Sequence, residues 1–274
     1  MKPKNLKKVL AMILCCVMLG MLGTFLPSCS SSNGDWDYIQ SKGTMIIGIT
    51  DFPPMDYKDG DGNWIGFDAE FAQAVCAKLG VTAQFQEVVD WTAIATELSS
   101  KNVDAIWNGM SVTDDRKKNM AISQSYMINH QVMVIAAENA DKYQTADNLN
   151  GVTAVAEDGS TGADVMNSDP FFAQAKKTPV DSQIKALMEV KAGTADIAVV
   201  DYLIAENALA GGDYSGLAVS PYKTFANEEY AIGFRKNSPD TLEKINGAIN
   251  ELLASGELQQ IADKYGLGDL LIKG

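Results

Sequence analysis

Arg116 stands in the stretch GMSVTDDRKK, residues 109–118, where a strand-like run gives way to a helix. Thr113 suits the N-cap of that helix, with Asp114 and Asp115 in its first turn. A capping box would place Glu or Gln three residues after the Thr. Arg116 stands there instead, a cation at the positive end of a helix dipole. It therefore either pairs with Asp114 or Asp115 at the surface or binds an anion that comes from elsewhere.

Composition excludes several other kinds of site. The chain has one histidine, His130, which excludes His-rich metal sites by count, and we expect neither a metal nor a cofactor. Cys76 lies in an expected helix among apolar residues, where a thiol is a small core residue rather than a nucleophile. The net charge of −13 opposes nucleic-acid binding, which needs a basic surface.

The N-terminal residues resemble a secretory signal. Four lysines precede an apolar run over residues 9–26, as in the charged and hydrophobic regions of such signals. The run meets LPSCS, which resembles a bacterial lipobox, so residues 1–28 are expected to be removed and Cys29 to carry lipid. A transmembrane anchor is the alternative, because the apolar run could nearly span a bilayer. Residues 29–40 would then form the lipidated start and a flexible tether.

After the tether, strand-like runs alternate with helical ones, which is typical of an α/β protein. Residues 44–50 predict a buried strand, and residues 66–80 predict a helix closed by a glycine. A second α/β segment begins at residue 151. The segments 97–111 and 189–203 each run from a helix end through an Asp into an apolar strand followed by polar residues. Two small α/β lobes of similar design are the simplest explanation.

The chain is predicted to return to its first lobe near its end, through a strand over residues 229–236 and two further helices. Two crossover strands would form a natural hinge, and ligands of open α/β sheets bind at the carboxyl ends of strands, so we expect a cleft between the lobes. Two rigidly docked domains without a functional cleft are the alternative. The predicted limits are residues 41–131 and 227–274 for lobe 1, residues 132–226 for lobe 2, and crossings near 130–137 and 220–228.

The stretch GFDAEFAQAVCAKL closely resembles the signature of family 3 extracellular solute-binding proteins, the polar amino-acid receptors of ABC importers. Ala69 departs from that pattern, which usually has a larger aliphatic residue there, at a position that affects packing rather than ligand contact. The resemblance spans about residues 38–265 and includes DFPPMDY, GMSVTDDR, GSTGADV, AVVD and GELQQIADKYG in the family's order. It implies an α/β, two-lobed periplasmic-binding-protein-like fold of type II, with two crossover strands as the hinge.

The resemblance also implies a binding site for the carboxylate of an amino acid. In such receptors the arginine at the position of Arg116 grips the α-carboxylate, and the planar fork of a guanidinium suits that group. Ser111 matches a hydroxyl that helps to hold the same carboxylate, and the backbone of Gly109 should face it. Backbone N–H groups at the start of the helix would add to the anion site.

The second lobe is expected to complete this site. Thr161, at the start of a predicted helix, matches a residue that closes onto the carboxylate, whereas Asp201 matches the acid that accepts the α-ammonium. A buried cation needs such a partner. The alternative is that Asp201, and either Ser160 or Thr161, merely cap the helices that follow them.

Side-chain specificity is expected from Asp51, Phe52 and Trp91. Phe52 and Trp91 match positions whose faces flank the ligand, and aromatic faces favour a cation or a planar group, although a core role is the alternative. Asp51, Asp90 and Glu157 place negative charge near the pocket. The ligand should therefore be a polar or cationic L-amino acid rather than an acidic one.

The predicted function is that of a receptor that captures an L-amino acid by hinge closure and delivers it to an ABC transporter permease. It would be a monomer, held by lipid on Cys29 at the outer face of the cytoplasmic membrane. A few enzymes share this scaffold, periplasmic dehydratases of the cyclohexadienyl type, for which His130 or Glu157 would have to serve as acid or base. A sensory module that presents ligand to a signalling receptor is a third possibility. The clamp of Arg116 and Asp201 needs no chemistry, which favours a receptor over an enzyme.

Overall fold

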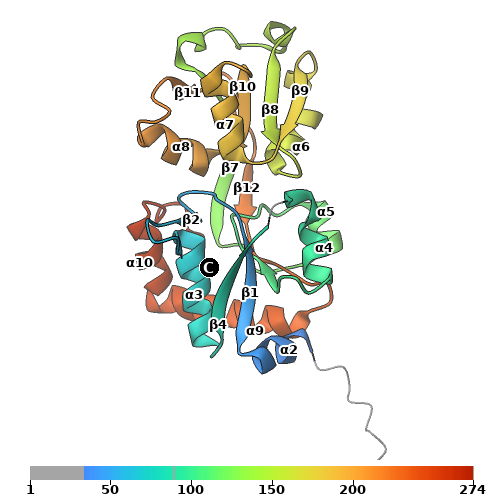
Figure 1. Ribbon diagram of the computed structural model, residues 1–274, viewed down its shortest axis with the longest axis vertical. Coiled ribbons are helices and arrows are strands. Elements are labelled where there is room, and N and C mark those ends of the chain that lie inside the picture. The colour runs from blue at the N-terminus through green and yellow to red at the C-terminus, as the bar shows by residue number, and fades with distance from the viewer. Residues whose placement is uncertain (1–33, 89, 274) are drawn as a thin grey trace, which may run out of the picture. The chain divides into compact units, whose positions relative to one another are not determined.

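The computed structural model describes residues 34–88 and 90–273 (Figure 1). The predicted signal, the alternative membrane anchor, Cys29 and the first part of the predicted tether lie outside this part of the chain. None of the helices in the described ranges is both long enough and apolar enough to cross a membrane.

The first sheet has five strands in the order β4-β1-β5-β13-β6. Strand β1 pairs in parallel with β4 and β5, and β13 runs antiparallel to β5 and β6. Met45 and Ile47 belong to one hydrophobic cluster and Ile46 to another, so apolar side chains cover both faces of β1. The strands are β1 (Thr44–Ile49), β4 (Thr82–Glu87), β5 (Ala105–Ile106), β6 (Ala121–Ile122) and β13 (Gly233–Phe234).

The second sheet follows the order β11-β7-β10-β8-β9, with β12 paired to β7. Strand β10 runs parallel to β8 and antiparallel to β7, and β8 runs parallel to β9. A small hairpin of β2 (Tyr57–Lys58) and β3 (Trp64–Ile65) stands apart from both large sheets. The strands of the second sheet are β7 (Met127–Ala136), β8 (Thr153–Glu157), β9 (Lys176–Val180), β10 (Ile197–Asp201), β11 (Leu217–Val219) and β12 (Asn227–Tyr230).

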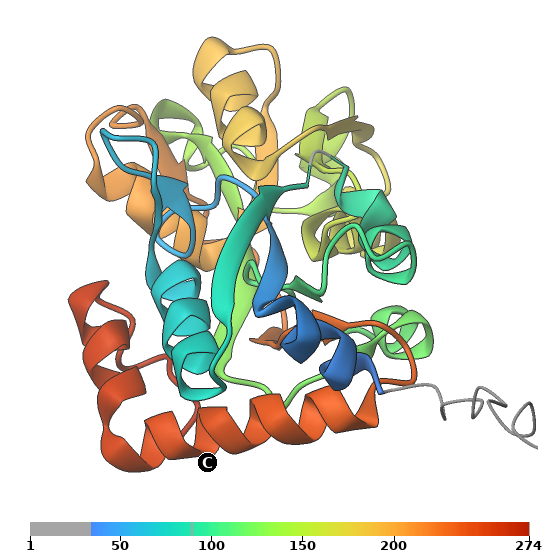
Figure 2. The same ribbon diagram turned by 60° about the horizontal axis from the view of Figure 1, so that its bottom comes forward.

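The helices pack against these sheets and against one another. Helix α9 contacts α2 and α3, and α10 contacts α3 and α9, an arrangement visible along the lower edge of Figure 2. The helices are α2 (Asp35–Lys42), α3 (Phe67–Lys78), α4 (Ile94–Ser99), α5 (Asp114–Asn119), α6 (Thr161–Ser168), α7 (Gln183–Ala192), α8 (Tyr202–Ala210), α9 (Pro239–Ser255) and α10 (Glu257–Lys264).

Two strands connect the halves of the structure. The first residues of β7 pair with β12, whereas its later residues pair with β10 and β11. Figure 1 shows β7 and β12 running between the elements around β1 and those around β10. The predicted strand 229–236 is in fact two strands, because β12 pairs with β7 and β13 joins the first sheet. The limits of the two lobes stay a prediction.

The predicted tether is too long. Residues 35–40 form most of α2, in which Trp36 and Ile39 are buried in the hydrophobic core. The backbone N–H of Trp36 also donates to the Asp240 carboxylate at 2.8 Å. The prediction was wrong for these residues because their polar composition conceals two apolar side chains three residues apart, which share one face of a helix.

Candidate functional site

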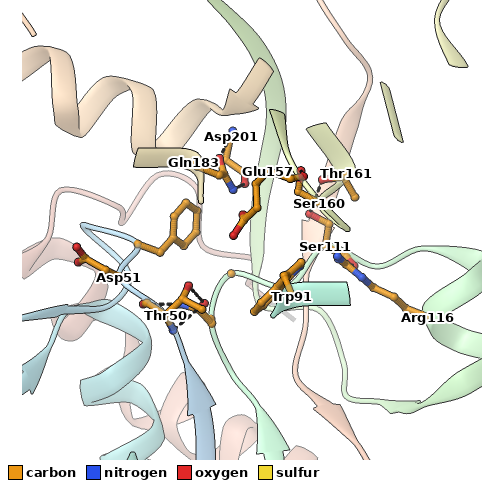
Figure 3. Close-up of a pocket in the computed structure, with 13 residues that line it drawn as sticks. Thr50, Asp51, Trp91, Ser111, Arg116, Glu157, Ser160, Thr161, Gln183 and Asp201 are labelled. Atoms are coloured by element: carbon orange, nitrogen blue, oxygen red, sulfur yellow. Dashed lines mark hydrogen bonds between the residues drawn. The ribbon is translucent and has the colours of Figure 1, made fainter. Parts of the chain in front are cut away.

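The ends of strands from both sheets surround one pocket, shown in Figure 3. Strands β1 and β5 are followed by lining residues on one side, and β8 and β10 end in lining residues on the other. The pocket contains about 390 Å³ of space that protein atoms do not fill, including space open to solvent. Its lining comprises Thr50, Asp51, Phe52, Trp91, Asn108, Gly109, Ser111, Arg116, Glu157, Ser160, Thr161, Gln183 and Asp201. All eight residues predicted to bind ligand are among them.

Arg116 enters the pocket from the first turn of α5. The Thr113 hydroxyl accepts from the Arg116 backbone N–H at 3.1 Å, so Thr113 is the N-cap as predicted and this N–H does not contribute to an anion site. The guanidinium donates from Nη1 to the Ser111 carbonyl at 2.7 Å and from Nη2 to the Gly159 carbonyl at 3.1 Å. Burial lowers the pKa of Arg116, and nearby carboxylates, Asp201 first among them, oppose that shift.

The Arg116 guanidinium has no charged partner in the described part of the chain, where no carboxylate oxygen lies within 4.0 Å of it. The alternative of a surface pair with Asp114 or Asp115 is therefore wrong. A guanidinium has five N–H donors, and its two carbonyl partners leave donors free for an anion. The guanidinium carbon also lies 5.8 Å from the centre of the Trp91 ring.

Gly109 lines the pocket, but its N–H is already bonded within the protein. Its N–H donates at 2.6 Å to the buried carboxylate of Asp68, which the Tyr126 hydroxyl also reaches at 2.8 Å. Burial raises the pKa of Asp68 to about 7, although these two hydrogen bonds favour its ionised form. Because the N–H is used in this way, Gly109 can present only its carbonyl oxygen, which suits an ammonium rather than a carboxylate.

The start of α6 brings two hydroxyls into the pocket in different roles. Ser160 is the N-cap, since its hydroxyl accepts from the Ala163 N–H at 3.1 Å. The Thr161 hydroxyl is thereby left for other partners: it accepts from Gln131 at 2.9 Å and lies 3.4 Å from the Ser111 hydroxyl. Ser111 and Thr161 therefore face each other across the pocket.

Asp201 ends β10 with its side chain buried, 4% of the residue being exposed. It occupies the N-cap position of α8, yet its side chain caps nothing, so the capping alternative is wrong. The carboxylate instead accepts from the side-chain amides of Asn129, Gln131 and Gln183. Burial, and then the charge of nearby Glu228, raise the pKa of Asp201. Its amide partners fix its orientation without neutralising its charge.

The three residues expected to set specificity differ in placement. Phe52 is buried, with its ring edge-on to Tyr230 at 6.4 Å between centroids, so it serves the core as well as the pocket. Trp91 is half-buried. Asp51 is exposed, and in Figure 3 its carboxylate points away from Glu157 and Asp201.

Asp90, which was expected to add negative charge to the pocket, does not line it. Its carboxylate accepts from the Thr92 backbone N–H at 2.9 Å and from the Thr92 hydroxyl at 2.6 Å, which caps the short helix that begins with Trp91. A carboxylate one residue before a helix is often used in this way.

Several lining residues were not predicted as ligand contacts. Asn108 accepts from the Thr50 N–H at 3.1 Å and donates to the buried Asp56 at 2.6 Å, so it holds the ends of β1 and β5 together. Its position at the end of an apolar strand was a usable signal. No sequence pattern indicates Gln183 as a pocket residue, because only the packing of α7 against β10 places it next to Asp201. Glu157 was placed near the pocket by the sequence and does line it.

With this geometry in place, the comparisons with known proteins decide the family. Residues 45–268 match the family model of bacterial extracellular solute-binding proteins, family 3. The chain belongs to this family. The arginine-binding extracellular protein ArtP of Bacillus subtilis strain 168 is 31% identical over 250 residues, covering 89% of this chain and 93% of that protein. The L-cystine-binding protein TcyJ of Escherichia coli K12 is 27% identical over 228 residues, covering 83% and 84%.

Solved structures confirm the fold class of this family 3 solute-binding protein. A substrate-binding protein of an ABC uptake transporter from Streptococcus pneumoniae, with histidine bound, superposes with a TM-score of 0.81 at 31% identity. The match covers 89% of this chain and all of that one. The two-lobed, type II periplasmic-binding-protein fold predicted from the sequence is therefore correct.

Proposed function

We propose that this family 3 solute-binding protein is a receptor that binds a free L-amino acid in the pocket of Figure 3. The observation that carries the proposal is the pair of half-buried Arg116 and buried Asp201, two groups of opposite charge that line one pocket. Neither has an oppositely charged partner within 4.0 Å among the residues that the structure describes. A zwitterion supplies both missing partners, its α-carboxylate to Arg116 and its α-ammonium to Asp201.

Residues on both sides of the pocket would complete the recognition of the amino-acid backbone. The Ser111 and Thr161 hydroxyls are close enough to share the α-carboxylate with Arg116. The Gly109 carbonyl is free to accept from the α-ammonium. Binding then draws the two halves together about β7 and β12, because the ligand bonds to both of them.

The role of the receptor would be uptake rather than catalysis. The loaded protein would dock on an ABC transporter permease, acting as a monomer anchored outside the cytoplasmic membrane by lipid on Cys29. The extracellular family and the names of its relatives support this reading, since the Bacillus protein is named as arginine-binding and the pneumococcal protein as part of an uptake transporter.

Isothermal titration of residues 30–274 with the common amino acids tests the proposal. We expect micromolar or tighter binding of at least one L-amino acid, about −8 kcal/mol or better. Arg116→Ala should weaken binding at least about 100-fold through loss of a charge-assisted, bidentate contact. Lys117→Ala is the matched control, because the exposed Lys117 is the next residue of α5 and does not line the pocket. Equal loss in both variants, or none in Arg116→Ala, would remove Arg116 from the site.

A dehydratase of the cyclohexadienyl type is the second candidate. The observation that favours it is the buried carboxyl group of Glu157 in the pocket. Burial raises the pKa of this carboxyl to about 7, within the range of a general acid. His130 does not support it, because its ring stacks on Tyr202 with 4.6 Å between centroids and does not line the pocket. Turnover of prephenate by the purified protein, abolished in Glu157→Gln, would establish this activity.

A further inference from the structure

Glu157 is a carboxylate with no role in the amino-acid clamp described above. It is the last residue of β8, and only 8% of its surface is exposed. In Figure 3 its side chain extends into the pocket toward the side from which Thr50 and Trp91 come. The Ser160 hydroxyl donates to the Glu157 backbone carbonyl at 2.7 Å, which holds the end of the strand in place without using the carboxylate.

The protein does not neutralise this carboxylate. Within the described ranges no Lys, Arg or His nitrogen lies within 4.0 Å of it. Burial raises the pKa of Glu157 to about 7, while the charge of Arg116 and the Gln183 amide act in the opposite direction without cancelling the effect of burial. A buried carboxylate without a cation is unfavourable, and a ligand that brings a cation removes that cost.

The charges that line the pocket do not balance for a neutral amino acid. Among the residues that the structure describes, three carboxylates, Asp51, Glu157 and Asp201, line the pocket with one guanidinium, that of Arg116. The α-carboxylate of a bound amino acid would pair with Arg116, and its α-ammonium would pair with Asp201. The carboxylates of Asp51 and Glu157 would then have no ionic partner from the ligand backbone. Asp51 is exposed and is solvated at the rim. Glu157 is the buried charge that still needs a partner.

We infer that Glu157 selects the ligand, and that this pocket binds an L-amino acid whose side chain ends in a cation held by the Glu157 carboxylate. The inference rests on the proposed function, because it takes the amino-acid clamp as given and names the class of side chain. The half-buried ring of Trp91 on the opposite side offers a π-face to the same cation.

Arginine and citrulline provide the sharpest test, because they have nearly the same shape and differ in side-chain charge. Titration calorimetry of the wild-type protein at pH 7.5 should show arginine, lysine or ornithine binding at least about 100-fold more tightly than citrulline or glutamine. In Glu157→Gln that preference should fall below about fivefold, chiefly through weaker binding of the cationic ligand. Asp90→Asn is the matched control: it makes the same carboxylate-to-amide change at a side chain that bonds to Thr92 and does not line the pocket, and it should keep the wild-type preference.

The outcomes separate this inference from the proposed function. Equal affinity of the wild type for arginine and citrulline, or a preference that survives in Glu157→Gln, would overturn the inference and leave the amino-acid receptor intact. Tight binding of only neutral amino acids would do the same. Binding of no amino acid at all would overturn the proposed function itself.

Proton release provides a measurement that needs no variant, should Glu157→Gln fail to fold. A cation that pairs with Glu157 must ionise it, so arginine binding at pH 7 should release about half a proton more than citrulline binding, measured from the binding heats in buffers of different ionisation enthalpy. Protons released from Asp201 by the α-ammonium are common to both ligands and cancel in this difference. Equal proton release by the two ligands would refute a direct pairing with Glu157.

Discussion

The Nη2 atom of Arg116 donates to the carbonyl oxygen of Gly159 at 3.1 Å, which joins the segment after β5 to the segment after β8. The same guanidinium is proposed to hold the ligand, so ligand binding and the approach of the two sides of the pocket involve one side chain. Gly159 has a φ of +73°, a conformation that residues with a side chain rarely adopt, and it lies close to Thr92 on the opposite side.

Replacing Gly159 by alanine should weaken ligand binding. A Cβ at this position would lie 3.0 Å from Cγ2 of Thr92 and 3.1 Å from its backbone nitrogen, so the contact across the pocket must open. We expect a loss of about 1 to 2 kcal/mol, roughly a tenfold rise in Kd, measured by calorimetry. Gly151→Ala is the control, because its φ of +81° imposes similar strain with nothing within 4 Å of the new Cβ. Similar Kd values for the two variants would contradict a role for close approach at Gly159.

Replacing Asp201 by asparagine should reduce affinity by about 3 kcal/mol or more, because a buried ligand ammonium would lose its anionic partner. The new amide would also meet the donors of Asn129, Gln131 and Gln183, so some loss of stability is expected. Titration calorimetry and urea unfolding measure the two effects separately. Retention of wild-type affinity in a folded Asp201→Asn variant would place the ammonium elsewhere.

The ligand-free protein should lose stability as the pH rises through the pKa of Glu157. Burial raises this pKa from 4.5 to about 7, so between these values the folded state holds a proton that the unfolded state releases. The free energy of unfolding therefore falls as pH increases toward 7, and the cost persists above it. Glu157→Gln removes this cost and should be more stable than wild type by up to about 3 kcal/mol at pH 8, and by far less at pH 4.5.

Urea unfolding of the ligand-free proteins at both pH values checks the prediction for Glu157, with Asp90→Asn again as the control. A stability difference between wild type and Glu157→Gln that is the same at pH 4.5 and pH 8 would mean that Glu157 does not titrate as its burial implies.

Cys76 should be inert in the folded protein. It is 1% exposed in α3, and burial raises the pKa of its thiol to about 12. An aromatic disulfide reagent should therefore modify Cys76 only after unfolding. Cys76→Ser should lower the free energy of unfolding by about 1 to 3 kcal/mol, since it buries a hydroxyl, and should leave the ligand Kd unchanged. Rapid labelling of the native protein would contradict the buried position.

Much of the fold could be predicted because its signals are local. The buried strand β1, the apolar stripe of α3 and the Thr113 cap each depend on residues a few positions apart, and all three occur as predicted. The split of residues 229–236 between β12 and β13 could not be foreseen, because one apolar run gives no sign that its halves pair with different sheets. Helix α2 was missed because it packs against α9, a helix about 200 residues further along the chain.

The sequence by itself determined the family, the two α/β lobes, the likeness to an amino-acid receptor and the eight residues that meet in the pocket, because spacing along the chain and residue type carry that information. Only the tertiary structure decided how these groups are used. The Gly109 N–H donates to Asp68, Asp90 caps a helix, and Glu157 is buried with no cationic nitrogen within 4.0 Å in the described part of the chain. Whether a polar group is free or already paired depends on neighbours that are remote in the sequence. Because an unpaired polar group is costly when it is buried, these pairings determine which groups remain to bind a ligand.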